Sequence, residues 1–172
     1  MPDSSRSSSS SGLEVVSADR SEAGRFARSF GVLLRGSVLR FRREEFLVSE
    51  VLLDFVRSFD RLPFTVGLPL GSFSGRGFHP SFALLDMLSS SSQRVVVRDD
   101  VAWLFTCGRD VFEERLLVSS PSRSGKVLVV DRSGSVLGLG EWRRDRQRFL
   151  IKNLFDRGDF LHRERRRKGG SR

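Results

Sequence analysis

Residues 126–140 read KVLVVDRSGSVLGLG, and this stretch decides the fold of the second half of the chain. Two apolar runs, Lys126–Val130 and Val136–Gly140, flank the turn sequence Asp131-Arg132-Ser133-Gly134. Glycine tolerates the positive φ that tight turns between antiparallel strands require, so the stretch predicts a β-hairpin.

Short apolar segments separated by turn residues surround this hairpin. Residues 94–97 and 116–118 predict strands, residues 99–104 predict a short helical segment, and residues 149–151 and 160–162 predict two more strands. Several short strands joined by tight turns are typical of a small β-barrel.

The first half of the chain carries three helical patterns. Asp19 and Glu22 have the spacing of a capping box, and an apolar stripe follows them at helical spacing up to Gly31. Ser49 is predicted to cap a second helix, and Pro80 suits the first turn of a third helix.

Strand patterns lie between these helices. Residues 32–41 predict two short strands around a glycine, and residues 64–70 predict another strand. The glycine-rich residues 72–78 predict a loop, and they lack the Gly-Lys-Ser/Thr of a phosphate-binding loop.

Four serines at residues 89–92 predict a linker between the two halves. The predicted fold class is α+β, with an N-terminal α/β domain followed by a small β-barrel. The predicted parts are a disordered Ser-rich tail at 1–12, the α/β domain at 13–92, the barrel at 93–164 and a basic tail at 165–172.

Positive charge is concentrated near the C-terminus. The formal net charge is +9, and residues 142–172 hold 12 Lys or Arg against four Asp or Glu, a net of +8. Such segregation of basic charge predicts a polyanionic partner, with nucleic acid favoured over a membrane surface.

A cluster of basic residues follows the 136–140 strand directly. We predict that it tracks the phosphates of RNA, and the alternative is a solvated charged loop. A second basic run, residues 163–168, either adds non-specific affinity for polyanions or is a solvated charged tail. The predicted RNA-binding cluster consists of Arg143, Arg144, Arg146, Arg148 and Lys152.

Aromatic and glycine residues beside this cluster are candidates for further RNA contacts. Trp142 and Phe149 are candidate base-stacking residues, with core packing favoured for Phe149, and Trp103 is predicted to be core. Gly138 and Gly140 share one face of a strand, which permits close approach of bound RNA or of a neighbouring strand. The neighbouring strand is the favoured interpretation.

Few residues suit catalysis or metal binding. The histidines are His79 and His162 and the one cysteine is Cys107, so no zinc site of ordinary spacing and no internal disulfide is expected. The adjacent acidic pairs 99–100 and 113–114 point in different directions and are poor acid/base partners. We therefore predict no enzyme, no cofactor, no metal, no small-molecule substrate and no membrane span.

Six motifs carry a family resemblance. They are GSF (71–73), FALLDML (82–88), VVV (95–97), LFTCGRDV (104–111), VLGLG (136–140) and FDRGDFLHRE (155–164). In order and spacing these motifs resemble the Nip-seven group of large-subunit ribosome-biogenesis factors, over roughly residues 67–164. Members of that group pair an N-terminal α/β "pre-PUA" domain with a C-terminal PUA domain, which is a β pseudo-barrel.

The resemblance implies a non-enzymatic RNA-binding adaptor in pre-ribosomal RNA processing and large-subunit assembly. Its partners would be ribosomal or pre-ribosomal RNA and other ribosome-assembly proteins, in a cytoplasmic, archaeal-type setting. The family's RNA contacts map onto the same basic cluster, and Arg157 joins it within the last motif.

Two other functions stay open at this point. One is an RNA-targeting subunit of an RNA-modification enzyme, in which a partner protein supplies the chemistry. The other is a protein-binding assembly scaffold that uses the Phe-rich N-terminal half, and a large exposed apolar patch there would favour it.

Overall fold

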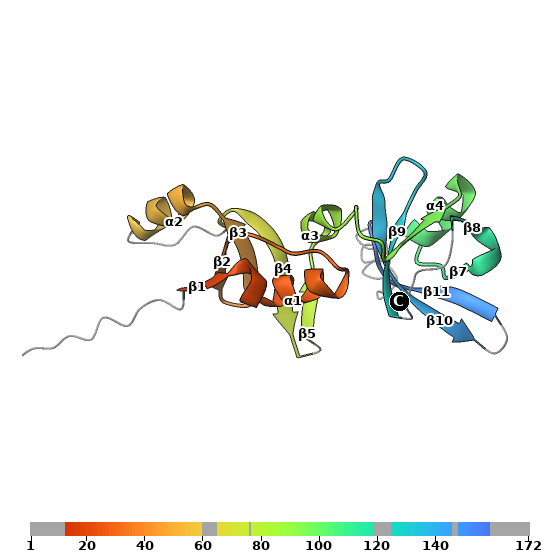
Figure 1. Cartoon of the computed structure of the whole chain (residues 1–172), viewed down its shortest axis with the longest axis horizontal. Helices are drawn as coiled ribbons and strands as arrows, with labels where there is room; N and C mark the ends of the chain where they lie inside the picture. The colour runs from red at the N-terminus through yellow and green to blue at the C-terminus, as the bar shows by residue number, and fades with distance from the viewer. Residues whose placement is uncertain (1–12, 60–64, 76, 119–124, 146–147, 159–172) are drawn as a thin grey trace, which may run out of the picture.

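Two β-sheets lie end to end along the long axis of the molecule, with helix α3 (Phe82–Met87) between them (Figure 1). The computed structural model describes residues 13–59, 65–75, 77–118, 125–145 and 148–158. The predicted α+β class is confirmed. Predictions for residues 1–12, for the strand at 160–162 and for the basic tail lie outside the described residues.

The first sheet is an antiparallel meander of five strands in chain order. Helix α1 (Glu22–Ser29) follows the first strand and the short helix η1 (Ala18–Arg20), and α2 (Glu50–Arg57) follows the third strand. The strands are β1 (Leu13–Ser17), β2 (Ser37–Phe41), β3 (Glu44–Val48), β4 (Leu68–Ser74) and β5 (Gly77–Pro80).

Helix α1 forms where its apolar stripe predicts, but its cap differs from the prediction. The hydroxyl of Ser21 accepts the N–H of Gly24 at 2.9 Å, while Asp19 lies outside the helix in η1. Glu45 of β3 completes the cap, because its fully buried carboxylate accepts the N–H groups of Glu22 and Ala23. The prediction of an Asp19–Glu22 capping box is therefore wrong, since a distant strand supplies the carboxylate.

The loop predicted at 72–78 is instead part of the β4–β5 hairpin. Phe73 and Phe78 face each other across it, with ring centroids 5.6 Å apart. Glycine-rich sequence suggested a turn over the whole segment, whereas the aromatic cross-strand pair holds it as two strands. Residues 32–35 form no strand, and Pro80 ends β5 while Ser81 caps α3.

The second sheet curls into a nearly closed six-stranded barrel with strand order β7-β11-β10-β9-β6-β8. Its elements are β6 (Arg94–Val97), α4 (Asp99–Thr106), β7 (Val111–Phe112), η2 (Glu113–Arg115), β8 (Leu116–Val118), β9 (Gly125–Val130), β10 (Val136–Asp145) and β11 (Arg148–Asp156).

The hairpin predicted at 126–140 is confirmed as β9 and β10. Gly134 has a φ of 86° at the turn, as predicted. The Asp131 carboxylate accepts the N–H groups of Ser133 and Ser135 at 2.9 Å each. A hydrogen bond from the Ser133 hydroxyl is the main reason that the pKa of Asp131 is lowered.

Gly138 and Gly140 allow β11 to approach β10 closely. A Cβ at Gly138 would lie 2.1 Å from the carbonyl oxygen of Phe155, and one at Gly140 would lie 2.2 Å from Cγ2 of Ile151. The approaching backbone is thus the neighbouring strand, as the favoured interpretation expected.

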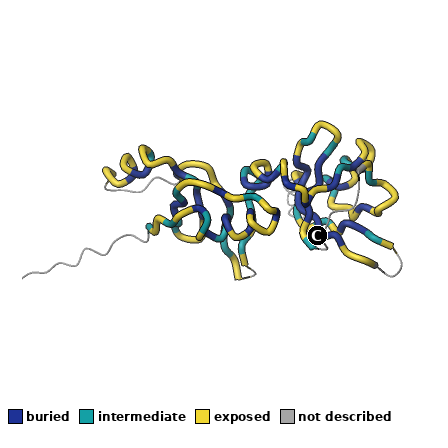
Figure 2. The backbone as a smooth tube through the Cα atoms, viewed as in Figure 1, coloured by how far each residue is buried: buried dark blue, intermediate teal, exposed yellow. Residues whose placement is uncertain are grey.

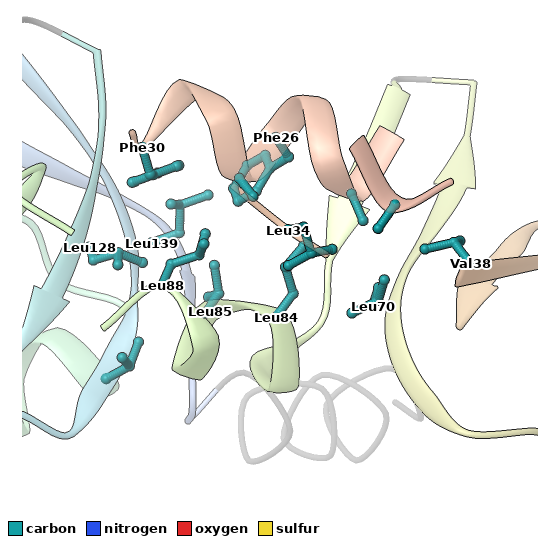
Figure 3. Packing of buried hydrophobic residues seen from close by; sticks show 14 of the residues in the cluster. Phe26, Phe30, Leu34, Val38, Leu70, Leu84, Leu85, Leu88, Leu128 and Leu139 are labelled. Atoms are coloured by element: carbon teal, nitrogen blue, oxygen red, sulfur yellow. The ribbon is translucent and has the colours of Figure 1, made fainter. Parts of the chain in front are cut away.

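Strand β9 contributes to two cores. Val127 and Val129 point into the barrel, while Leu128 and Val130 point out of it and pack against α1 and α3. Figure 3 shows Leu128 and Leu139 of the barrel beside Phe30, Leu85 and Leu88 of the first domain.

The serine segment between the sheets is packed. Ser91 is only 4% exposed, and its hydroxyl donates to the carbonyl oxygen of Phe30 at 2.6 Å. Buried residues continue from the first sheet through α3 into β9 (Figure 2). The two domains therefore share a hydrophobic core, and their predicted boundary at residue 92 stays a prediction.

Candidate nucleic-acid interface

The predicted RNA-binding residues lie on the β10–β11 hairpin, and the register of these strands sorts them by face. Trp142 pairs with Ile151, Arg143 with Leu150 and Arg144 with Phe149. Paired residues share a face of a sheet, and successive residues point to opposite faces. Because Trp142 and Ile151 are buried in the barrel core, Arg143 points to the outer face and Arg144 to the inner face.

The outer face of β9, β10 and β11 carries an exposed basic surface. Glu141 pairs with Lys152 on one side and with Lys126 on the other, which places all three side chains on this face with Arg143. Arg148 is two residues from Leu150 and has the same orientation. We define the outer basic face as Lys126, Arg143, Arg148 and Lys152, all of which are exposed.

The outer basic face carries four cations against two acidic positions, Glu141 and Asp145. Glu141 pairs with Lys126 and Lys152 across the neighbouring strands, and Asp145 pairs with Arg148. Among the described side chains, no ion pair joins Lys126, Arg143 or Lys152 to a carboxylate. The surface therefore has an excess of positive charge that is open to an anionic ligand.

Arg144 has a different environment from Arg143. Its guanidinium lies 6.0 Å from the ring centroid of Phe149, which in turn stacks on Trp142 at 5.3 Å. Trp142 is 4% exposed, so it belongs to the barrel core and is not a base-stacking residue. Phe149 packs against the same core, as favoured from the sequence.

Arg157 lies at the junction of the two domains. Its guanidinium forms an ion pair with Asp86 of α3 at 2.6 Å and donates to the carbonyl oxygen of Val136. The same group lies 4.7 Å from the ring centroid of Phe82. Arg157 is thus engaged within the protein, and Arg146 lies outside the described residues.

Comparison with known families identifies the barrel. The family described as the UPF0113 PUA domain matches residues 93–165. Residues 93–165 are therefore similar to the PUA domain of this family. The match confirms the resemblance predicted from the motifs, and it covers the outer basic face.

One solved structure shows the same fold over more of the chain. A conserved PUA domain protein from Thermoplasma acidophilum aligns with a TM-score of 0.57 and 18% identity, covering 88% of this chain and 98% of that one. A hypothetical protein from the archaeon Pyrococcus horikoshii aligns with a TM-score of 0.43 and 16% identity, covering 86% and 98%. No curated protein matches the sequence.

Two residues of the PUA domain surface were missed in the sequence. Lys126 seemed only to begin the β9 strand, yet its ammonium reaches to 5.5 Å from the Phe26 ring of α1. Phe112 stands on the two-residue edge strand β7 and is 44% exposed. A sequence contains no explicit register between strands, so neither position could be assigned to the basic face from spacing alone.

The remaining polar candidates do not converge. His79 contacts the hydroxyl of Ser74 at 2.6 Å within the β4–β5 hairpin, and Cys107 is half-buried at the end of α4. Across the described residues, no group of three or more His, Cys, Asp or Glu is arranged to hold a metal ion. No helix in the described part of the chain is long and apolar enough to span a membrane.

Proposed function

We propose that this protein is a non-enzymatic RNA-binding adaptor in ribosome biogenesis, acting on pre-ribosomal or ribosomal RNA of the large subunit in the cytoplasm. The outer basic face carries the proposal, because its four exposed cations outnumber the two acidic positions on the same face. PUA domains bind RNA, and the family resemblance links this domain to large-subunit assembly.

The proposed mechanism is phosphate docking. Arg143, Arg148 and Lys152 donate to phosphate oxygens and fix the position of the RNA on the sheet. Each phosphate that is neutralised on a single strand releases counterions, so log affinity falls with log salt by about 0.7 per contact. Arg157 is placed outside this surface, because the domain junction already engages it.

The test is fluorescence anisotropy with labelled single-stranded RNA across a salt series. The variant Arg143→Ala/Arg148→Ala/Lys152→Ala should lose affinity by roughly 150-fold, at about 1 kcal/mol for each of the three lost contacts. It should also lose about two units of salt slope. Stability should change little, since all three side chains are exposed.

The matched control removes three positive charges elsewhere. Arg25, Arg57 and Arg98 are each exposed and ion-paired with a neighbouring carboxylate. Their triple alanine variant should bind RNA within about two-fold of wild type, apart from the small effect of net charge. Equal losses in both variants would mean that net charge, and not this surface, governs binding.

The ribosomal part of the proposal needs a separate measurement. The purified protein is added to a cell extract of its source, and its sedimentation with large-subunit precursors is followed on a density gradient. Wild type should comigrate with these particles at low salt, and the triple variant of the outer basic face should stay at the top. Comigration of neither protein contradicts the assembly role while leaving RNA binding to the anisotropy test.

A protein-binding scaffold is the second candidate, and an apolar surface on α2 favours it. Val51 is 80% exposed and Phe55 59% exposed, and Phe55 contacts Phe59 edge-to-face with ring centroids 4.7 Å apart. A pocket of about 420 Å³ opens beside them, lined by Leu52, Phe55, Val56, Phe59, Thr65, Val66 and Gly67. Absence of RNA binding at physiological salt would make this candidate the leading one.

A further inference from the structure

We propose that Phe112 is a stacking platform for one base of the bound RNA strand, on the outer face of the barrel. This inference rests on the proposed RNA-binding function, and it adds a base-contacting residue to a surface otherwise made of cations. It also predicts a preference for single-stranded over duplex RNA, because a base must leave its own stack to reach the ring.

Strand register fixes the direction in which Phe112 points. Val111 pairs with Ile151 and Phe112 pairs with Leu150. Val111 and Ile151 are 1% and 0% exposed and belong to the barrel core. Phe112 must therefore point to the opposite, outer face.

The ring of Phe112 shares that face with the phosphate-binding cations. Phe112, Leu150 and Arg143 form one row across β7, β11 and β10, so the two ends of the row are about 10 Å apart. Arg148 and Lys152 are diagonal neighbours of Phe112 on β11, about 7–8 Å away at the backbone. Leu150 is only 4% exposed and forms the apolar floor between them.

Exposure and surroundings separate Phe112 from the other exposed aromatic residues. Trp103 is 68% exposed, but it lies on α4, whose first turn holds two acidic residues. Phe55 and Phe59 contact each other and belong to α2 and the segment after it. Phe112, at 44% exposure, is the exposed aromatic side chain among the described residues that shares a sheet face with the outer cations.

The charges on either side of Phe112 favour one orientation of the RNA strand over its ring. Glu113 and Glu114 follow Phe112 directly in η2, whereas the cations lie toward β10 and β11. Phosphates are repelled from the first side and attracted to the second, so the sugar–phosphate backbone follows β11 while a base turns toward β7. This arrangement of a basic surface and an aromatic platform suits a single strand without strong sequence preference.

The test compares Phe112→Ala and Phe112→Trp with wild type, using a labelled oligouridine of about 12 nucleotides, which is within the usual range of single-strand site sizes. Loss of one stacked base should weaken binding of the Phe112→Ala variant roughly 5- to 100-fold without a change in salt slope. The Phe112→Trp variant should bind at least as tightly as wild type, and RNA should quench its added tryptophan fluorescence. Phe55→Ala is the matched control and should bind as wild type does.

Each outcome separates the stacking role from the underlying function. If Phe112→Ala binds as tightly as wild type while the triple variant of the outer basic face does not, stacking is contradicted and RNA binding stands. If Phe112→Ala loses equal affinity for oligouridine and for an abasic oligomer of the same length, the ring supports the fold or the phosphates and not a base. If wild type does not bind either oligomer, the proposed function and the stacking role both fail. Thermal unfolding of each variant verifies that it is folded.

Discussion

Arg40 of the first sheet and Arg143 of the barrel have opposite roles. In the first sheet, Arg40 donates to the fully buried carboxylate of Glu45 at 2.9 Å and to Glu14 at 2.7 Å, and these bonds raise the pKa of its guanidinium. In the barrel, Arg143 stands exposed on the outer face opposite Leu150 and has no ion pair among the described side chains. A cation that is satisfied within the protein supports the fold, whereas an unpaired cation on a rigid strand is available to a ligand.

The largest expected effect is a loss of stability in the first sheet, where Arg40 is paired within the protein. Glu45→Ala removes the acceptor of Arg40 and of two N–H groups at the start of α1. Breaking such a buried network should cost about 3–5 kcal/mol of unfolding free energy, measured by urea titration. The folded fraction should bind RNA normally, and a loss below about 1 kcal/mol would mean that water replaces the carboxylate.

Alanine substitution of two neighbouring arginines of the barrel should change RNA affinity by different amounts. Arg143→Ala should weaken RNA binding by about five-fold, corresponding to about 1 kcal/mol, because Arg143 lies on the outer basic face. Arg144→Ala should change it less than about two-fold, since Arg144 lies over Phe149 on the other face. Equal losses, measured by anisotropy at one salt concentration, would show that the hairpin binds RNA on both faces.

A smaller effect on stability is expected at the domain junction. Arg157→Ala removes one half-exposed ion pair, one hydrogen bond to a backbone oxygen and one contact with an aromatic ring. The unfolding free energy should fall by about 1–2 kcal/mol, and RNA affinity should stay within about two-fold of wild type. If the substitution reduces the binding free energy by more than the unfolding free energy, Arg157 belongs to the RNA surface, as the sequence motif predicts.

The smallest effect concerns pH. Hydrogen bonds hold the pKa of Asp131 below its ordinary value, so its charged form stabilises the β9–β10 turn at neutral pH. That contribution is complete above about pH 4 and is lost as pH falls through the lowered pKa. Asp131→Asn should reduce the acid dependence of stability by less than about 1 kcal/mol, because the turn is near the surface. Thermal unfolding at several acidic pH values measures the difference, and identical pH profiles would contradict it.

Local patterns predicted the elements that depend on local chemistry. The 126–140 hairpin, helices α1 and α2 and the strand at 94–97 all follow from turn residues, caps and apolar spacing. The basic cluster was also visible, because charge segregates along the chain irrespective of fold.

Features that depend on strand register could not be predicted in the same way. Trp142 was interpreted as a candidate ligand contact and Trp103 as core, but Trp142 is 4% exposed and Trp103 is 68% exposed. A one-residue change of register exchanges the two faces of a strand, so the side of each aromatic ring is decided by pairing between distant residues. The cap from Glu45 to α1 was missed for a related reason, since its partners are 22 and 23 residues away.

Photo-crosslinking with single-stranded RNA that contains 4-thiouridine tests the central contrast most directly. The crosslinked peptides should come from β7, β10 and β11, around Phe112, Arg143 and Lys152. The first sheet has its own exposed arginines, Arg42 and Arg43, in the turn between β2 and β3. Crosslinks concentrated at that turn, with few in the barrel, would contradict the account, because they would place the RNA on the first sheet and not on the outer basic face.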